Sequence, residues 1–239
     1  MPLPKIATPT YELELPSTGQ TIQYRPFLVK EEKLLVLALE GEDVKEITTA
    51  IKNVIKSCIQ TKGIKVDTLP TFDIEYLFLN IRGKSVGEEL EVKLMCPDDN
   101  ETYVPVMIPI DEIGILKSEE HTKQIKLDAN LMMEMKYPSL AEFIKNNFDF
   151  GEEASMDQSF DLIASCIDKI YNEEEVWAAA DCTKKEINSF LEQMNSSQFK
   201  EIESFFETMP KLSHTVKVTN PKTKVESEIV LEGLSSFFG

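Results

Sequence analysis

The chain has 239 residues, 42% of them hydrophobic and 28% charged, a size that fits one large domain or two small ones. Its formal net charge is −17, from 42 acidic and 25 basic residues, and no basic run exceeds two residues. Phosphate groups attract clustered lysine and arginine side chains, so neither a nucleic-acid ligand nor an anionic membrane surface is expected. No small-molecule ligand is expected either.

Neither a signal peptide nor a membrane span is predicted. The first residues, MPLPKI, lack a long apolar core, and no stretch approaches about 18 uninterrupted apolar residues. The cysteines are widely scattered, at Cys58, Cys96, Cys166 and Cys182. Without a secretory signal, this spacing favours free thiols in a reducing compartment.

The first part of the chain is expected to form a β-hairpin followed by three helices. Apolar residues that alternate around a glycine turn predict the hairpin over 13–27. Apolar residues at helical spacing predict helices over about 30–40, over 43–58 and after Pro70, where Thr71 is the expected N-cap. One apolar stripe of the third helix contains Ile74, Leu77, Phe78 and Ile81.

A second hairpin is expected in the middle of the chain. Alternating apolar residues predict it over 90–108, with a polar turn at 97–100. The next segment has a weaker pattern, which suggests one or two strands around Ile125, Leu127 and 132–135.

The second half is expected to be mostly helical. Capping-box patterns at 139–142 and 183–186 predict two helix starts. Apolar residues predict further helical turns over 187–194 and 199–209, and a closing hairpin over 215–231. One more helix is predicted from the spacing of Phe160, Ile163, Ile167 and Ile170.

The predicted elements define a mixed fold. The fold class is α+β, with an N-terminal hairpin and helices, a central β-hairpin, and a mostly helical second half closed by a C-terminal β-hairpin. The segment 151–158 has the composition of a loop. It divides an N-terminal α+β region, 1–150, from a C-terminal helical region, 151–239, either as separate domains or within one continuous domain.

No catalytic, metal or cofactor site is predicted. The only histidines, His121 and His214, lie near no Gly-x-Ser-x-Gly motif, and the chain has no Cys-x-x-Cys pair for zinc. The glycines of 83–87 fit a helix exit better than a phosphate loop, because position 78 lacks the required glycine. The acidic run 98–101 lacks the spacing of a calcium loop.

The remaining candidates are apolar contact residues. Phe237 and Phe238 lie at the end of the chain, where they either fold back into the core or anchor a partner. The single tryptophan, Trp177, presents the same two alternatives. The helical stripe completes the candidates with Ile74, Leu77 and Phe78, although such a stripe usually belongs to the core.

Several segments resemble one known family. The stretch YRPFLVKEEKLL at 24–35 resembles the N-terminal signature of the baseplate hub proteins of T-even-type bacteriophages. Four further segments are similar to that family, at 69–78, 82–86, 205–212 and 231–234. The likeness therefore extends over nearly the whole chain.

The resemblance implies a hub subunit or hub assembly factor of the phage tail. Such a protein acts in the host cytoplasm during assembly, and its retention in the virion baseplate is left open. The family offers no catalytic residues to transfer. Some relatives carry Cys-x-x-Cys knuckles in similar hairpins, but this chain has only Cys96 in its middle hairpin, so no metal site is transferred.

The expected function is therefore non-enzymatic. We expect a baseplate hub protein that acts through contacts with other hub or tail proteins. One alternative is a transient chaperone that shields a tail protein such as the tape measure and then leaves. A third interpretation, which no sequence feature favours, is a carboxylate- or metal-dependent hydrolase.

Overall fold

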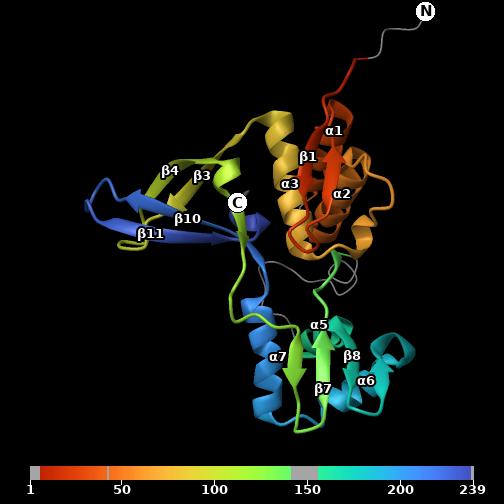
Figure 1. The fold of residues 1–239 in the computed structure, drawn as a ribbon. Helices are drawn as coiled ribbons and strands as arrows, with labels where there is room; N and C mark the ends of the chain where they lie inside the picture. Colours follow the sequence, from red (N-terminus) through yellow and green to blue (C-terminus); the bar gives the residue numbers. More distant parts are fainter. Residues whose placement is uncertain (1–5, 42, 141–155, 238–239) are drawn as a thin grey trace, which may run out of the picture. The chain divides into compact units, whose positions relative to one another are not determined.

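The computed structural model describes residues 6–41, 43–140 and 156–237, and it confirms the predicted α+β class (Figure 1). The chain forms two compact units. The first unit contains 1–116 and 211–239, and the second contains 117–210.

This division differs from the predicted boundary between Phe150 and Gly151. The cause is a long-range strand pairing, because the C-terminal hairpin returns to pair with a strand from the first half of the chain, Lys211 opposite Leu116. Local composition does not reveal such a pairing. The proposed seam also lies largely outside the described residues, since 141–155 are not described and helix α5 already includes 156–158.

The first unit begins with the predicted hairpin and three helices. Asp43 caps the second helix, because its carboxylate accepts hydrogen bonds from the N–H groups of Lys45 and Glu46. The elements are β1 (Tyr11–Glu14), β2 (Thr21–Tyr24), α1 (Val29–Glu40), α2 (Val44–Cys58), η1 (Val66–Thr68) and α3 (Thr71–Val86).

Two details of α3 correct the sequence prediction. Thr71 is the first helical residue rather than the N-cap, because the Pro70 carbonyl accepts the first helical hydrogen bonds. The helix also continues through Gly83 instead of ending there. A Cβ atom at Gly83 would lie 3.0 Å from Ile110, so the glycine permits close packing, and Gly87 with φ of 154° follows the helix end.

The rest of the first unit consists of two hairpins, and both were predicted. Strand β10 pairs with β11 on one side and with the unpredicted β5 on the other, while β3 and β4 form a separate sheet. The elements are β3 (Glu89–Met95), β4 (Tyr103–Pro109), η2 (Ile110–Glu112), β5 (Gly114–Leu116), β10 (Lys211–Thr219), β11 (Glu226–Glu232) and η4 (Leu234–Phe237).

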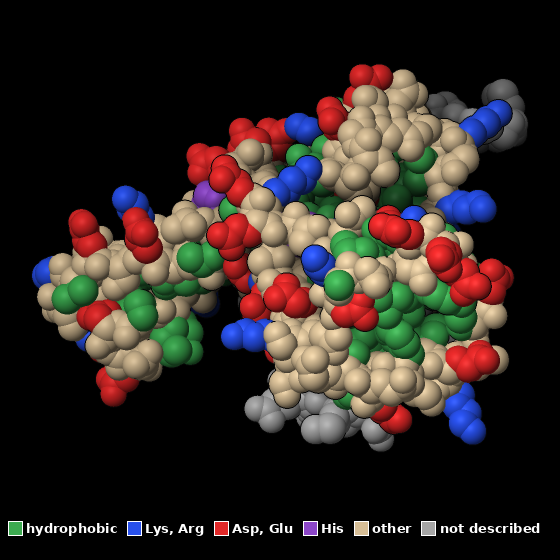
Figure 2. Space-filling view, turned by 60° about the horizontal axis from the view of Figure 1, so that its bottom comes forward, with side chains coloured by type: hydrophobic (Ala, Val, Ile, Leu, Met, Phe, Trp, Pro, Cys, Tyr) green, Lys and Arg blue, Asp and Glu red, His purple; other side chains and the backbone are tan. Residues whose placement is uncertain are grey.

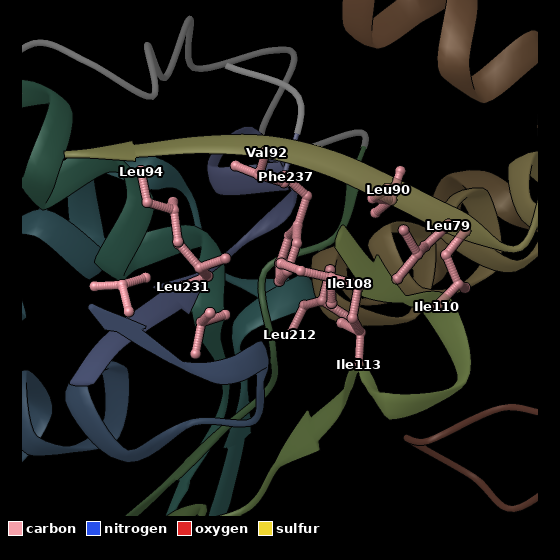
Figure 3. Packing of buried hydrophobic residues seen from close by; sticks show 12 residues of the cluster. Leu79, Leu90, Val92, Leu94, Ile108, Ile110, Ile113, Leu212, Leu231 and Phe237 are labelled. Carbon is pink, nitrogen blue, oxygen red and sulfur yellow. The ribbon is translucent and has the colours of Figure 1, made fainter. Parts of the chain in front are cut away.

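One apolar core joins these hairpins to α3. Figure 3 shows Phe237 pointing in among residues of both sheets, including Val92, Ile108 and Leu212. Its side chain is buried. Of the two alternatives for the C-terminal phenylalanines, Phe237 therefore folds back into the core. Phe238 lies outside the described residues.

The second unit is a four-stranded antiparallel sheet with helices, in the order β6-β7-β8-β9. Its core contains residues from the sheet and from α5, α6 and α7. The elements are β6 (Gln124–Lys126), β7 (Met132–Met135), α5 (Met156–Cys166), β8 (Ile167–Tyr171), β9 (Val176–Ala178), η3 (Ala179–Asp181), α6 (Lys184–Leu191) and α7 (Ser196–Thr208).

The predicted helix from Phe160 to Ile170 is only partly correct. It ends at Cys166, and Ile167 and Ile170 lie in β8, where they pair with β7. Isoleucine suits a half-buried strand, and here strand pairing outweighed helical spacing. The predicted second half was therefore too helical, because β8 and β9 were missed.

The two capping boxes predicted at helix starts have different outcomes. The capping box at Thr183 and Glu186 is confirmed by hydrogen bonds in both directions. A capping box that the sequence analysis did not identify, Asn195 with Gln198, begins α7. The box predicted at 139–142 extends into residues that the structure does not describe.

Candidate functional site

Helix α1 and its N-cap residue expose an unusual number of large apolar side chains. These residues are between 41% and 79% exposed, whereas only Glu31 and Ala38 of the helix are buried. The exposed residues are Leu28, Val29, Leu34, Val36, Leu37 and Leu39. Single exposed leucines are common on protein surfaces. A helix with apolar side chains on all sides, in contrast, is usually covered on several sides by other elements or by a partner.

Exposed apolar side chains also occur elsewhere. Figure 2 shows hydrophobic side chains that reach the surface in patches bordered by acidic and basic side chains. On strands, the exposed apolar residues include Met95, Tyr103, Met107 and Val230.

A nearly buried ion pair anchors the start of α1. Arg25 Nη2 lies 3.0 Å from Glu31 Oε1, and the Leu28 N–H donates to Glu31 Oε2 at 2.8 Å. Burial opposes ionisation of Glu31, but the hydrogen bonds from Arg25, Leu28 and Lys30 outweigh it, so the pKa of the Glu31 carboxyl is lowered. The carboxylate therefore holds the first turn of α1 against the preceding segment.

The same segment is tied to the other two helices. The Arg25 N–H donates to the Cys58 carbonyl at 3.0 Å, at the end of α2. The Phe27 N–H donates to Ser85 Oγ at 2.9 Å, and this hydroxyl donates to the Ile81 carbonyl within α3. Residues 24–28, part of the stretch that resembles the family's N-terminal signature, thus hold the start of α1 in place.

A hollow lies beside α1. Leu34 lines the hollow on the side of α1, and residues of α2 and its N-cap line the rest. The remaining lining residues are Asp43, Lys45, Glu46, Thr49, Ala50 and Asn53. Apolar, acidic and basic side chains therefore meet along this side of the helix.

The end strand of the second unit is another exposed apolar site. Strand β9 pairs only with β8 among the described strands, and Val176 and Trp177 on it are exposed. The acidic residues 173–175 directly precede them and are also exposed. Trp177, a residue singled out from the sequence, is thus accessible.

The other candidate contact residues are not accessible. Ile74, Leu77 and Phe78 are buried in the core of the first unit, at most 7% exposed. Phe237 is buried as well. The helix with a large exposed apolar surface is therefore α1, which sequence reasoning did not select. Its apolar residues on nearly every side were the available signal.

The histidines adopt structural roles in the described part of the chain. His121 Nδ1 lies 3.0 Å from Thr208 Oγ1, and that hydroxyl donates to the Ser204 carbonyl, so His121 must be the donor to Thr208. His121 cannot then accept the Thr208 proton as a general base would. The Nδ1 atom of His214 lies 3.1 Å from the Glu112 carbonyl, which can only accept.

The environment of His121 is aromatic. Its ring centroid lies 5.6 Å from that of Tyr137 and 5.2 Å from that of Phe205, and its Nε2 atom is buried with no hydrogen-bond partner among the described residues. Burial and the charge of Lys123 lower the pKa of His121. The ring therefore packs in neutral form within the second unit.

The acidic turn at 98–101 joins the tips of the two hairpins in the first unit. The buried Asn220 amide donates to both Asp98 oxygens, at 3.0 and 3.1 Å, and the Thr223 hydroxyl also donates to Asp98. Asp99 accepts from Glu101 and Thr102. These carboxylates are thus engaged by groups of the same chain.

Neither a metal cluster nor a membrane-spanning helix is found among the described residues. None of these residues form a cluster of three or more side chains suited to hold a metal ion. In the same part of the chain, every helix is too short or too polar to cross a membrane.

Comparison with known families identifies the class of protein. Residues 8–239 match the sequence model of the family described as T4 bacteriophage base plate protein. The chain therefore belongs to this family of phage baseplate proteins. Comparisons with curated proteins and with solved structures gave no match.

Proposed function

We propose that this chain is a hub protein of the phage baseplate that acts in tail assembly through protein–protein contacts, without catalysing bond chemistry. The observation that carries this proposal is the pair of exposed apolar residues, Val176 and Trp177, on the end strand β9 of the second unit. Membership of the baseplate family supports it, because baseplate proteins have other phage structural proteins as partners. Large exposed apolar patches commonly mark such contacts.

The proposal includes a place and a set of partners. The chain acts in the host cytoplasm while the tail is assembled, and afterwards it belongs to the virion baseplate. Its partners are other hub or tail proteins. The alternative, a transient chaperone for a tail protein such as the tape measure, makes the same contacts but leaves the finished particle.

We propose Trp177 as a contact residue for such a partner. Tryptophan is enriched among residues that dominate binding energy, and Trp177 lies exposed on the end strand of its sheet. The neighbouring acidic residues 173–175 would favour a partner surface with a basic rim around an apolar pocket.

The test is an affinity pull-down of the tagged chain from phage-infected cells, with bound proteins identified by mass spectrometry. We expect recovery of hub or tail proteins, and a clearly lower recovery with Trp177→Ala. Tyr103→Ala is the matched control, because Tyr103 is an exposed aromatic residue on a strand of the other unit. A folded bait that captures no phage protein would contradict the proposed function.

Mass spectrometry of purified virions separates the two forms of the proposal. A hub protein is expected in the finished particle at a fixed ratio to other baseplate proteins. Its absence from virions, combined with capture of a tail protein in infected cells, would favour the transient chaperone.

A further inference from the structure

We propose that α1 pairs antiparallel with α1 of a second copy of this chain, so that the protein forms a symmetric dimer. This inference goes beyond the proposed function and does not depend on it. A monomeric chain could still be a hub protein, and a dimer could form in the absence of any phage partner.

The exposed residues of α1 are arranged symmetrically about the point between Val36 and Leu37. Lys33 and Glu40 lie at equal distances from this point along the sequence. These four side chains are exposed and fall within one sector of about 100° around the helix, opposite the buried Glu31 and Ala38. In an antiparallel helix pair centred here, Val36 of each copy would meet Leu37 of the other.

The charges are complementary in the same arrangement. Lys33 and Glu40 are seven residues apart, so they lie on the same side of α1 about 10.5 Å from each other. An antiparallel second copy would bring Lys33 of each chain opposite Glu40 of the other. Two ion pairs would then flank a central apolar contact, one at each end.

Both charged groups are available for this contact. Among the described residues, neither Lys33 nor Glu40 has an ion-pair partner, whereas Lys30 lies 3.3 Å from Glu31 within the same helix. The contact would therefore not require the loss of an ion pair within the described chain.

A second copy fits this surface better than an unrelated basic protein would. A twofold symmetric interface requires a surface that is complementary to itself, and the reversed order of Lys33 and Glu40 meets that requirement. The whole chain has a net charge of −17, which opposes association of two copies. Helix α1, however, holds two lysines and three glutamates, so its own contribution to that repulsion is small.

The first experiment measures the mass of the purified full-length chain by sedimentation over a wide range of concentrations. We expect a monomer–dimer equilibrium for the wild type and a monomer for Leu37→Lys. Val230→Lys is the matched control, because Val230 is similarly exposed but lies on β11, and this variant should retain the dimer.

Charge exchange then tests the antiparallel register. Lys33→Glu and Glu40→Lys should each weaken the dimer about tenfold or more, because every substitution occurs twice in a symmetric pair and creates two like-charge contacts. An equimolar mixture of the two variants should form a 1:1 heterodimer with affinity near that of the wild type, and the double variant should do the same by itself.

A wild-type chain that remains monomeric at all concentrations would overturn the inference. So would a dimer whose dissociation constant is unchanged by Leu37→Lys and by both charge substitutions. These experiments need only the purified chain, while the proposed function is tested by capture of phage proteins. The two proposals can therefore fail separately.

Discussion

Helices α1 and α3 belong to the same unit, and both are rich in apolar residues, yet they lie in opposite environments. Leu77 of α3 is fully buried, whereas Leu37 of α1 is 54% exposed. Helix α3 contacts α2, β5, β10 and η2, while α1 packs chiefly on α2. An apolar stripe in a sequence therefore does not distinguish a core helix from a contact helix, since that depends on what packs against it.

The glutamates of the two helices differ in the same way. Hydrogen bonds from Arg25, Leu28 and Lys30 overcome burial and lower the pKa of Glu31 in α1. In α3, burial raises the pKa of Glu75 to about 7, although the Leu234 N–H donates to its carboxylate at 3.1 Å. One glutamate is held as a paired carboxylate, and the other ionises only as the pH approaches neutrality.

The largest expected effect on stability is in α3, the buried helix of the two. Leu77→Ala should lower the free energy of unfolding by about 3 kcal/mol, because it leaves a cavity among buried residues. Leu37→Ala removes the same atoms from an exposed site and should change the free energy of unfolding by less than about 0.5 kcal/mol. Urea denaturation at a concentration where the chain is monomeric measures both. Equal losses would mean that α1 is covered within the chain itself.

A smaller effect is expected at the anchor of α1. Arg25→Ala should lower the free energy of unfolding by about 2 kcal/mol, because Glu31 would remain buried with its main cationic partner removed. Lys30→Ala removes an exposed partner of the same carboxylate and should cost less than about 0.5 kcal/mol. A loss of similar size in both variants would show that Glu31 is more solvated than the structure indicates.

The pH dependence of Arg25→Ala provides a second check. The pKa of Glu31 is lowered in the folded chain, so its contribution to stability is present above the ordinary value of 4.5 and is lost as the pH falls below it. The wild type should therefore lose more stability than Arg25→Ala between pH 5 and pH 3.

The smallest of the three effects is expected at Glu75, and it has the opposite sign. The folded pKa is raised to about 7, so the unfolded chain releases this proton first and stability falls as the pH rises from 4.5 to 7. Glu75→Gln keeps an oxygen that can accept from Leu234 but cannot ionise. It should raise the free energy of unfolding at pH 8 by about 1 to 2 kcal/mol and leave it nearly unchanged at pH 4.

Thermal or urea unfolding of both chains at several pH values tests this prediction. Glu32→Gln on the exposed surface of α1 is the control and should not alter the pH dependence. If wild type and Glu75→Gln show parallel curves from pH 4 to pH 8, Glu75 is ionised in the folded chain at neutral pH.

Much of the local structure could be predicted from neighbouring residues. The three hairpins and most helices were correct, because alternation, helical spacing, turn residues and capping boxes act over a few residues. The break at Cys166 was missed, since the spacing of Ile167 and Ile170 fits a helix as well as a strand. Of the candidate contact residues, Trp177 is exposed, whereas those of α3 are buried.

The sequence by itself determined the family, the mixed fold class and the positions of most turns and caps, because these depend on residue identity and short-range spacing. Tertiary structure alone decided where the two units divide, since that depends on β10 returning to pair with β5. It also decided that α3 is covered while α1 is exposed. Burial is a property of what packs around a side chain. Both helices contact α2, and they become different because the hairpins cover α3 as well.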